Sequence, residues 1–208
     1  TVTATDGANP TTQDITVNIT NVIENSPPVF TSNSSFTVEE NQTSAANITV
    51  TDADSDSISF SLSGTDVDSF AISSSGALTF NTAPDYETKG SYSLIITAAD
   101  GAVSVNQAVT ITISNINEVP QISALSSNQL PDENQSNVVT VSASDPDTST
   151  TLTYTLSGTD SSLFAISSSG VLTFKAAPDY EAPGDTDGDN NYQINVVVSD
   201  GSLSVTQA

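Results

Sequence analysis

An internal repeat of about 94 residues constrains this chain more than any other feature of its sequence. Residues 63–80 recur with few changes as residues 157–174, and residues 84–87 recur as 178–181, each 94 positions later. Repetition at a fixed period indicates that one structural unit is used more than once, so the fold of one repeat predicts the fold of the chain. A unit of this length has the size of an ordinary domain.

The same repeat divides the chain into three parts. Residues 1–24 match residues 95–118, so we expect them to be the last two strands of a preceding repeat. Residues 25–118 are then a complete repeat, and residues 119–208 are a repeat that lacks its last strand. The sequence is therefore expected to be a window cut from a longer array of such units.

Short segments of alternating apolar and polar residues fill each repeat. Residues 58–62, 92–97 and 109–113 alternate with a period of two, and glycine-containing turns at 74–76 and 99–102 separate such segments. Since no segment shows a helical pattern, the sequence predicts an all-β chain of tandem seven-stranded Greek-key β-sandwiches, like immunoglobulin domains. The recurring aromatic residues are expected in the sandwich cores and at strand ends rather than on a ligand-stacking surface: Phe70, Phe80, Tyr86, Tyr92, Phe164, Phe174, Tyr180 and Tyr192.

The charge of the chain is strongly one-sided. It has 25 Asp and Glu residues against two Lys and Arg and no His, for a net charge of −23. Nucleic acids and anionic membrane surfaces are recognised by cationic side chains, so neither is an expected partner. The absence of cysteine excludes disulfides and thiol chemistry. The sequence contains no apolar run of about 18 residues, so it predicts no membrane-spanning segment.

Acidic residues recur at the predicted ends of strands, where antiparallel topology sorts them onto two poles of each repeat. Asp52, Asp54 and Asp100 are expected to share one pole. Glu40, Asp85 and Glu87 are expected to share the other. Hard cations such as calcium take six to eight oxygen ligands from carboxylates and carbonyl groups. Because the chain offers almost only such ligands, we expect divalent ions at the boundaries between repeats. Asp66, Asp68 and Asp160 lie outside this set and are expected to be surface or turn residues.

Five motifs recur in a fixed order: Glu-Asn, Asp-x-Asp, Asp-x-Glu, Ala-Asp-Gly and, between repeats, Asn-x-Asn-Glu-x-Pro at 115–120. Together they resemble the extracellular cadherin repeat, in its bacterial cadherin-like form, over the whole chain. The resemblance implies a junction filled by three calcium ions, with backbone carbonyl groups of Ile116 and Val119 among the ligands. The side chains that it implies at the middle junction are Glu40, Asp85, Glu87, Asn117, Glu118, Asp145, Asp147 and Asp200.

The resemblance implies further sites that are expected to be incomplete or empty. The first junction would use Glu24, Asn25, Asp52, Asp54 and Asp100, but Ile23 stands where the alignment places Asn117, which removes one amide oxygen. The far end offers a half-site of Glu133, Asp179 and Glu181. An insertion of six residues carries Asp185, Asp187 and Asp189 around Gly188, and its pattern fits either a compact calcium loop or a solvated hairpin tip.

These features favour a calcium-rigidified spacer or adhesion module of a long, repetitive extracellular or cell-surface protein. Its expected partners are calcium and neighbouring repeats or other copies of the chain. One alternative is an extracellular filament completed by strand donation between chains. Another is a glycan-binding module of a secreted hydrolase. Enzyme activity is not expected, since the paired carboxylates are explained by the repeat and no His, Cys or Arg accompanies them.

Overall fold

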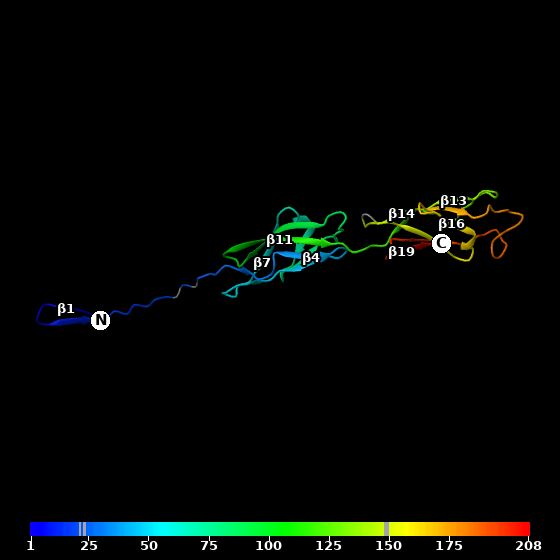
Figure 1. Cartoon of the computed structure of the whole chain (residues 1–208). Coiled ribbons are helices and arrows are strands. Elements are labelled where there is room, and N and C mark those ends of the chain that lie inside the picture. The colour runs from blue at the N-terminus through cyan, green and yellow to red at the C-terminus, as the bar shows by residue number, and fades with distance from the viewer. Residues whose placement is uncertain (21, 23, 148–149) are drawn as a thin grey trace.

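The strands of the chain fall into two β-sandwiches and a separate N-terminal hairpin (Figure 1). The computed structural model describes residues 1–208 apart from 21, 23, 148 and 149. Its described part contains no α-helix, and the only helical turns there are two short 3-10 segments, η1 (Val67–Ser69) and η2 (Ser161–Leu163). None of these described turns is long and apolar enough to cross a membrane. The all-β prediction is confirmed.

The first sandwich consists of strands between residues 29 and 114. One layer has the order β4-β11-β10-β7, and the facing layer has the order β5-β9-β8, with a short β3-β6 pair beside them. β11 runs antiparallel to β10 and parallel to β4, so the last strand of the sandwich lies beside one of the first. The seven expected strands appear as nine because the first two are each interrupted: β3 (Val29–Phe30), β4 (Ser35–Glu39), β5 (Ser44–Asn47), β6 (Val50–Thr51), β7 (Ser59–Ser63), β8 (Phe70–Ile72), β9 (Ala77–Phe80), β10 (Ser91–Ala99) and β11 (Ser104–Ser114).

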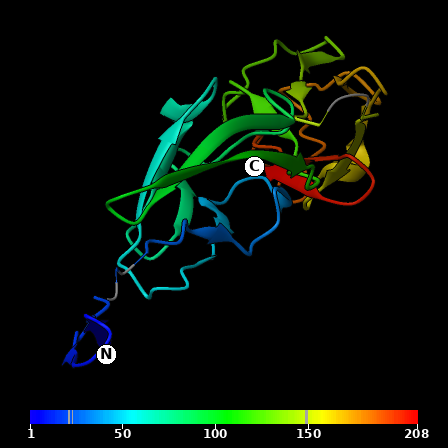
Figure 2. The ribbon, with the colours of Figure 1, turned by 90° about the vertical axis from the view of Figure 1, so that its left-hand side faces the viewer.

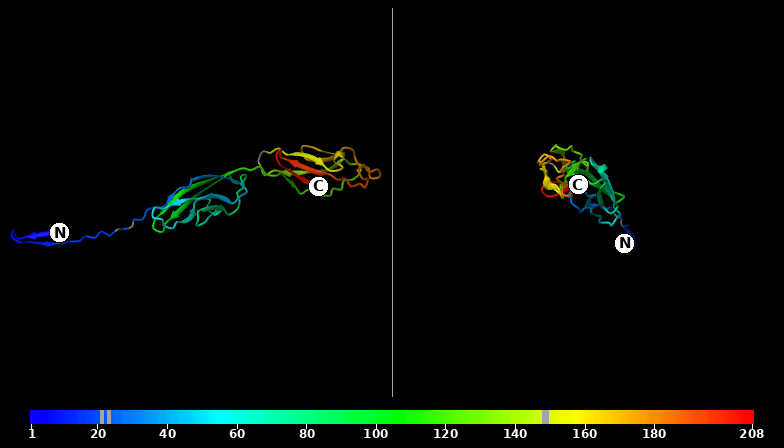
Figure 3. Two further views of the ribbon diagram at one scale, coloured as in Figure 1. Left: turned by 90° about the horizontal axis from the view of Figure 1, so that it is seen from below. Right: turned by 90° about the vertical axis from the view of Figure 1, so that its right-hand side faces the viewer.

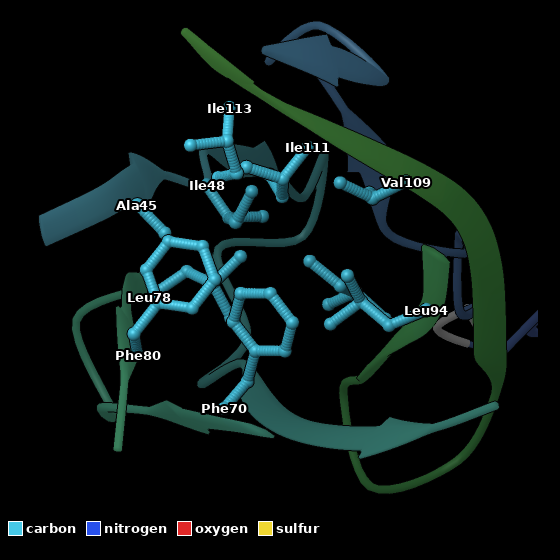
Figure 4. Close-up of a cluster of buried hydrophobic side chains, with 10 residues drawn as sticks. Ala45, Ile48, Phe70, Leu78, Phe80, Leu94, Val109, Ile111 and Ile113 are labelled. Carbon is cyan, nitrogen blue, oxygen red and sulfur yellow. The ribbon is translucent and has the colours of Figure 1, made fainter. Parts of the chain in front are cut away.

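Alternate residues of β10 and β11 close the core of this sandwich (Figure 4). Val109, Ile111 and Ile113 are at most 2% exposed, while the threonines between them face solvent. This is the pattern expected of a sheet with one buried face. Burial of each such side chain contributes about 1.5–3 kcal/mol relative to exposure.

An aromatic trio supports each core. The ring centroids of Phe70, Phe80 and Tyr92 lie 4.5–5.6 Å apart in tilted and edge-to-face pairs. The equivalent trio of the second sandwich is Phe164, Phe174 and Tyr192, with centroids 4.3–5.7 Å apart. The expectation that these rings form core is confirmed. The prediction is wrong for the two remaining aromatic residues, Tyr86 and Tyr180, which are 41% and 68% exposed in loops between strands.

The second sandwich repeats this plan with shorter strands at one side. β12 (Gln121–Ser123) pairs with β14 (Ser142–Ser144), and two three-stranded sheets have the orders β13-β17-β16 and β15-β18-β19. Those strands are β13 (Asn137–Thr140), β15 (Thr153–Ser157), β16 (Phe164–Ile166), β17 (Val171–Phe174), β18 (Asn195–Ser199) and β19 (Ser204–Gln207). β19 pairs with β18 in the register that β11 has with β10, and no described strand corresponds to β4.

The two sandwiches lie end to end, joined by residues 115–120 (Figure 3). The N-terminal hairpin of β1 (Val2–Thr5) and β2 (Pro10–Gln13) projects away from both of them, at the end of an extended segment (Figure 2). The loops of the first sandwich that follow β4 and precede β10 therefore face the second sandwich across the 115–120 linker, and both are acidic.

Candidate metal centre

Glu40 ties the linker to the first sandwich. It follows β4 directly and is 1% exposed, and its two oxygens accept hydrogen bonds from the N–H groups of Ile116 and Tyr86, both at 2.8 Å. Asn41 then takes a left-handed backbone conformation at φ 63°, which asparagine tolerates better than most residues. The repeated Glu-Asn motif is thus a buried acceptor followed by a turn, and Asn134 repeats it at φ 60°.

Five carboxylates from both sandwiches converge beside this linker. Glu40, Asp85 and Glu87 each offer an oxygen within 4.8 Å of the others, and Glu87 forms a second such group with Glu118 and Asp147. Glu87 belongs to both groups, so the two are continuous. The structure therefore brings together predicted ligands that lie up to 107 positions apart in the sequence, from Glu40 to Asp147.

The other predicted ligands of the second sandwich lie against the linker as well. Asp147 accepts a hydrogen bond from Glu118 N at 2.8 Å and donates its own N–H to Asp145 Oδ1 at 2.9 Å. Asn117 Nδ2 donates to Asp200 Oδ2 at 2.8 Å. This bond from Asn117, together with the N–H groups of the following turn, lowers the pKa of Asp200 and keeps it charged.

Three buried carboxylate oxygens at this junction have no hydrogen-bond donor. They are Glu87 Oε2, Glu118 Oε2 and Asp145 Oδ2. A buried acceptor without a partner is costly, and a buried charge is more so. The two lysines do not serve them, because Lys89 pairs with Asp66 and Lys175 donates to the Ser162 carbonyl. These three unpartnered oxygens are acceptor atoms that the described protein groups leave open to a cation.

The electrostatics of Glu87 agree with this interpretation. Burial raises its pKa, and the charges of Glu40, Asp147 and Glu118 raise it further. Two unit charges about 4 Å apart repel by about 4 kcal/mol at an effective dielectric constant near 20. Because every donor atom here is an oxygen, a hard cation of calcium type fits the site, whereas a soft metal does not.

At the first junction, between the N-terminal segment and the first sandwich, the first sandwich makes the contacts that the second sandwich makes at the middle junction. Asn25 Nδ2 donates to Asp100 Oδ2 at 2.9 Å, as Asn117 does to Asp200, and Ser26 N donates to Asp54 Oδ2 at 2.6 Å, as Glu118 N does to Asp147. Asn25 thus makes the contact that Asn117 makes at the middle junction. Ile23, on which the expected loss of an amide oxygen rests, lies outside the described residues.

Two further residues at these poles escaped prediction. Asp56 joins Asp52 and Asp54 in a group whose oxygens lie within 4.8 Å, and Asp52 Oδ2 is buried without a donor. Aspartates at every second position, 52, 54 and 56, are the sequence pattern that could have predicted this group. Asn41 Nδ2 donates to Glu118 Oε1 at 2.6 Å and so orients the linker carboxylate. Glu24 is exposed and joins none of the described acidic groups.

The far end of the second sandwich carries the expected half-site. Glu133, Asp179 and Glu181 are exposed, with oxygens within 4.8 Å of one another. Tyr180 N donates to Glu133 Oε2 at 3.0 Å, which repeats the contact between Tyr86 and Glu40.

The inserted loop forms a compact acidic turn. Asp185, Asp187 and Asp189 offer oxygens within 4.8 Å of one another, and Gly188 supplies a left-handed turn at φ 74°. Asp185 is 8% exposed; burial opposes its ionisation, but N–H donors from Asp189 and Asn190 lower its pKa. A hydrogen bond with Asp185 and the charge of Asp189 raise the pKa of Asp187.

Asp160 is a turn residue, as predicted, and it is also buried. It lies at the turn before η2, but it is 3% exposed and accepts hydrogen bonds from Thr186 and Gln193, so it is not a surface residue. The counterpart Asp66 binds Lys89 Nζ at 2.5 Å and Ser93 N at 2.7 Å, and the bond from Lys89 lowers its pKa. Both aspartates fasten the loop that precedes the next long strand.

Comparison with known proteins agrees with this fold. Residues 34–114 match the family model described as Cadherin domain. The structure is similar to human protocadherin-24 EC1-2, form II, with a TM-score of 0.58 and 21% identity over 86% of this chain and 92% of that one. It is also similar to mouse cadherin-23 EC22-24, with a TM-score of 0.51 and 26% identity over 86% of this chain and 62% of that one. A search of curated proteins gave no match.

These likenesses establish the fold, and the family match confirms the cadherin resemblance for residues 34–114. The chain spans less than two thirds of the mouse cadherin-23 fragment.

Proposed function

We propose that this chain, whose residues 34–114 belong to the cadherin domain family, is a calcium-stiffened spacer or adhesion module of a long extracellular surface protein. The observation that carries the proposal is the set of buried, unpartnered carboxylate oxygens on Glu87, Glu118 and Asp145. These residues come from the first sandwich, the linker and the second sandwich, so one group of cations holds all three together.

Each part of the junction has a distinct task. Glu87, Glu118 and Asp147 would share an ion, and Glu40 and Asp85 would complete its neighbour. Asp145, Asp200 and Asn117, with the carbonyl groups of Ile116 and Val119, would hold the side toward the second sandwich. Bound calcium supplies positive charge that cancels the repulsion among these carboxylates.

Neutralisation of this kind couples calcium to stiffness. Without a cation the carboxylates repel one another across the linker, which favours separation of the sandwiches. With calcium bound, metal–ligand bonds to both sandwiches restrict motion about the linker. Extracellular calcium modules bind with dissociation constants of about 10⁻⁴–10⁻³ M, so the junction is loaded outside cells and empty at cytosolic calcium levels.

Calcium titration followed by thermal melting tests the proposal. Calcium at about 100 times its dissociation constant adds about 2.7 kcal/mol for each site that binds only the folded state. The melting temperature should therefore rise by about 10 °C or more. Sodium chloride at the same ionic strength is the control. An equal rise with sodium chloride would mean that screening, rather than a metal site, stabilises the chain.

The pH dependence should have opposite signs with and without calcium. In chelator, the folded state holds the pKa of Glu87 above its usual value, so the protonated form contributes stability at acid pH that is lost as the pH rises through that pKa. Calcium needs the charged carboxylate, so its affinity should fall as the pH decreases through the same range. Melting curves between about pH 4 and about pH 8, recorded with calcium or with chelator, check both signs.

A further inference from the structure

Two carboxylates of the middle junction have the same arrangement of hydrogen-bond donors. Glu118 Oε1 accepts a hydrogen bond from Asn41 Nδ2 at 2.6 Å, while Glu118 Oε2 is buried and has no donor among the described residues. Glu87 Oε1 accepts one from Asn115 Nδ2 at 3.0 Å, and Glu87 Oε2 is also buried without a described donor. In each carboxylate, therefore, an amide holds one oxygen and the other oxygen is left bare.

The first sandwich fixes the backbone of Asn41. The Asn41 N–H donates to the Pro84 carbonyl at 2.9 Å, and the left-handed φ of 63° turns the chain directly after the buried Glu40. Because this backbone is held at the pole, the amide of Asn41 has a defined place from which to reach the linker. Its bond to Glu118 joins residues that lie 77 positions apart.

Asn115 holds Glu87 in the opposite sense, since Asn115 begins the linker and Glu87 belongs to the first sandwich. The residues on both sides of Asn115 are bonded to Glu40. The Ser114 carbonyl accepts from Glu40 N at 3.2 Å, and Ile116 N donates to Glu40 Oε1 at 2.8 Å. These bonds hold the backbone of Asn115 against the pole at which Glu87 lies.

Neutral donors of this kind suit a cation site. An amide N–H fixes the orientation of a carboxylate but adds no positive charge, so the negative charge remains available to an ion. A ligand that is oriented before the ion arrives also loses less conformational freedom on binding. Asp145 shows the same division with a backbone donor, because its Oδ1 accepts from Asp147 N at 2.9 Å and its Oδ2 is bare.

We propose that Asn41 and Asn115 are positioning residues, which hold one oxygen of Glu118 and one oxygen of Glu87 so that the other oxygen of each faces a divalent cation. They would set the calcium affinity of the middle junction without binding the ion themselves. This inference rests on the proposed function and deepens it, because neither asparagine belongs to the ligand set that the cadherin resemblance implies.

Titration calorimetry of the full chain measures the contribution of Asn41. Asn41→Gly should lower the calcium affinity of the middle junction about tenfold or more, since partners that orient metal ligands contribute about 10–100-fold. Glycine accepts the left-handed backbone, so the fold is kept. Asn134→Gly is the matched control, because Asn134 has φ 60° and donates its N–H to the Pro178 carbonyl at 2.8 Å, but lies at the far end of the second sandwich.

Melting in chelator distinguishes positioning from a structural role. Asn41→Gly and Asn134→Gly should shift the chelator melting temperature alike, whereas only Asn41→Gly should weaken calcium binding at the middle junction. A lower chelator melting temperature for Asn41→Gly with unchanged calcium affinity would assign Asn41 a purely structural role and overturn the proposal.

A double-mutant cycle tests whether Asn41 acts through Glu118. In the Glu118→Gln background, Asn41→Gly should lower the calcium affinity by no more than about twofold, because the charged oxygen that the amide positions has gone. Asn115→Ala with Glu87→Gln is the equivalent cycle. Asn115→Gln, which keeps an amide donor, should recover part of the affinity that Asn115→Ala loses. Fully additive losses in both cycles would overturn the proposal.

The same titrations separate this inference from the function on which it rests. If the original chain binds calcium and both Asn41→Gly and Asn115→Ala bind it equally well, the positioning role is wrong and the calcium-stiffened junction stands. If the original chain binds no calcium, both are wrong.

Discussion

Replacing Glu118 with glutamine is expected to lower the calcium affinity of the middle junction at least about tenfold. Glutamine keeps the size of the side chain and the hydrogen bond from Asn41, and the bond from the backbone N–H of residue 118 to Asp147 does not involve the side chain. What is lost is the charged oxygen beside Glu87. Residues that only orient metal ligands change metal affinity by about 10–100-fold, so a ligand itself should have no smaller effect. Calcium titration calorimetry measures the change.

The same variant should be more stable than the original chain in chelator, because one of the mutually repelling charges has gone. This reversal of sign separates a metal ligand from a residue that merely supports the fold. Asp68→Asn is the matched control, since Asp68 is exposed and lies in none of the described acidic groups. If Glu118→Gln and Asp68→Asn shifted the affinity and the chelator melting temperature equally, Glu118 would not be a ligand.

Gly76→Ala is expected to destabilise the first sandwich by about 2–5 kcal/mol. Gly76 has φ +84°, and a Cβ there would lie 2.1 Å from the Ile48 carbonyl oxygen. The left-handed backbone costs an alanine about 1–2 kcal/mol, and displacing packed backbone adds about 1–3 kcal/mol. The clash breaks the hydrogen bond from Ile48 N to Gly76 O, which joins the two loops at 2.8 Å.

Calorimetry of the full chain distinguishes this effect from backbone strain alone. Gly76→Ala should lower one unfolding transition by about 10 °C or more. Gly170→Ala should do the same to the other sandwich, because its Cβ would lie 2.2 Å from the Val141 oxygen. Gly101→Ala has φ +99° but no atom within 4 Å, so it should show the strain term only. Equal losses for Gly76→Ala and Gly101→Ala would contradict the clash.

Repetition made the fold predictable from the sequence. The alternation in residues 92–97 and 109–113 correctly placed β10 and β11, because a strand with one buried face must alternate. The interruptions of the first two strands were missed, since the alternation there is too short to distinguish one strand from two.

The acidic poles were predictable for the same reason, but their details were not. Antiparallel topology fixes which strand ends lie together, and this put Glu40, Asp85 and Glu87 in one group. The burial of Asp160 was missed because Thr186, which donates hydrogen bonds to it, belongs to the six-residue insertion that the first repeat lacks.

The distance between spin labels across the middle junction tests calcium stiffening most directly. Thr110 on β11 and Thr155 on β15 are exposed, one in each sandwich, and the absence of cysteine allows both to be labelled as Thr110→Cys and Thr155→Cys. Pulsed electron paramagnetic resonance should give a broad distance distribution in chelator and a single narrow one in saturating calcium. A distribution of equal width in both conditions would contradict the account.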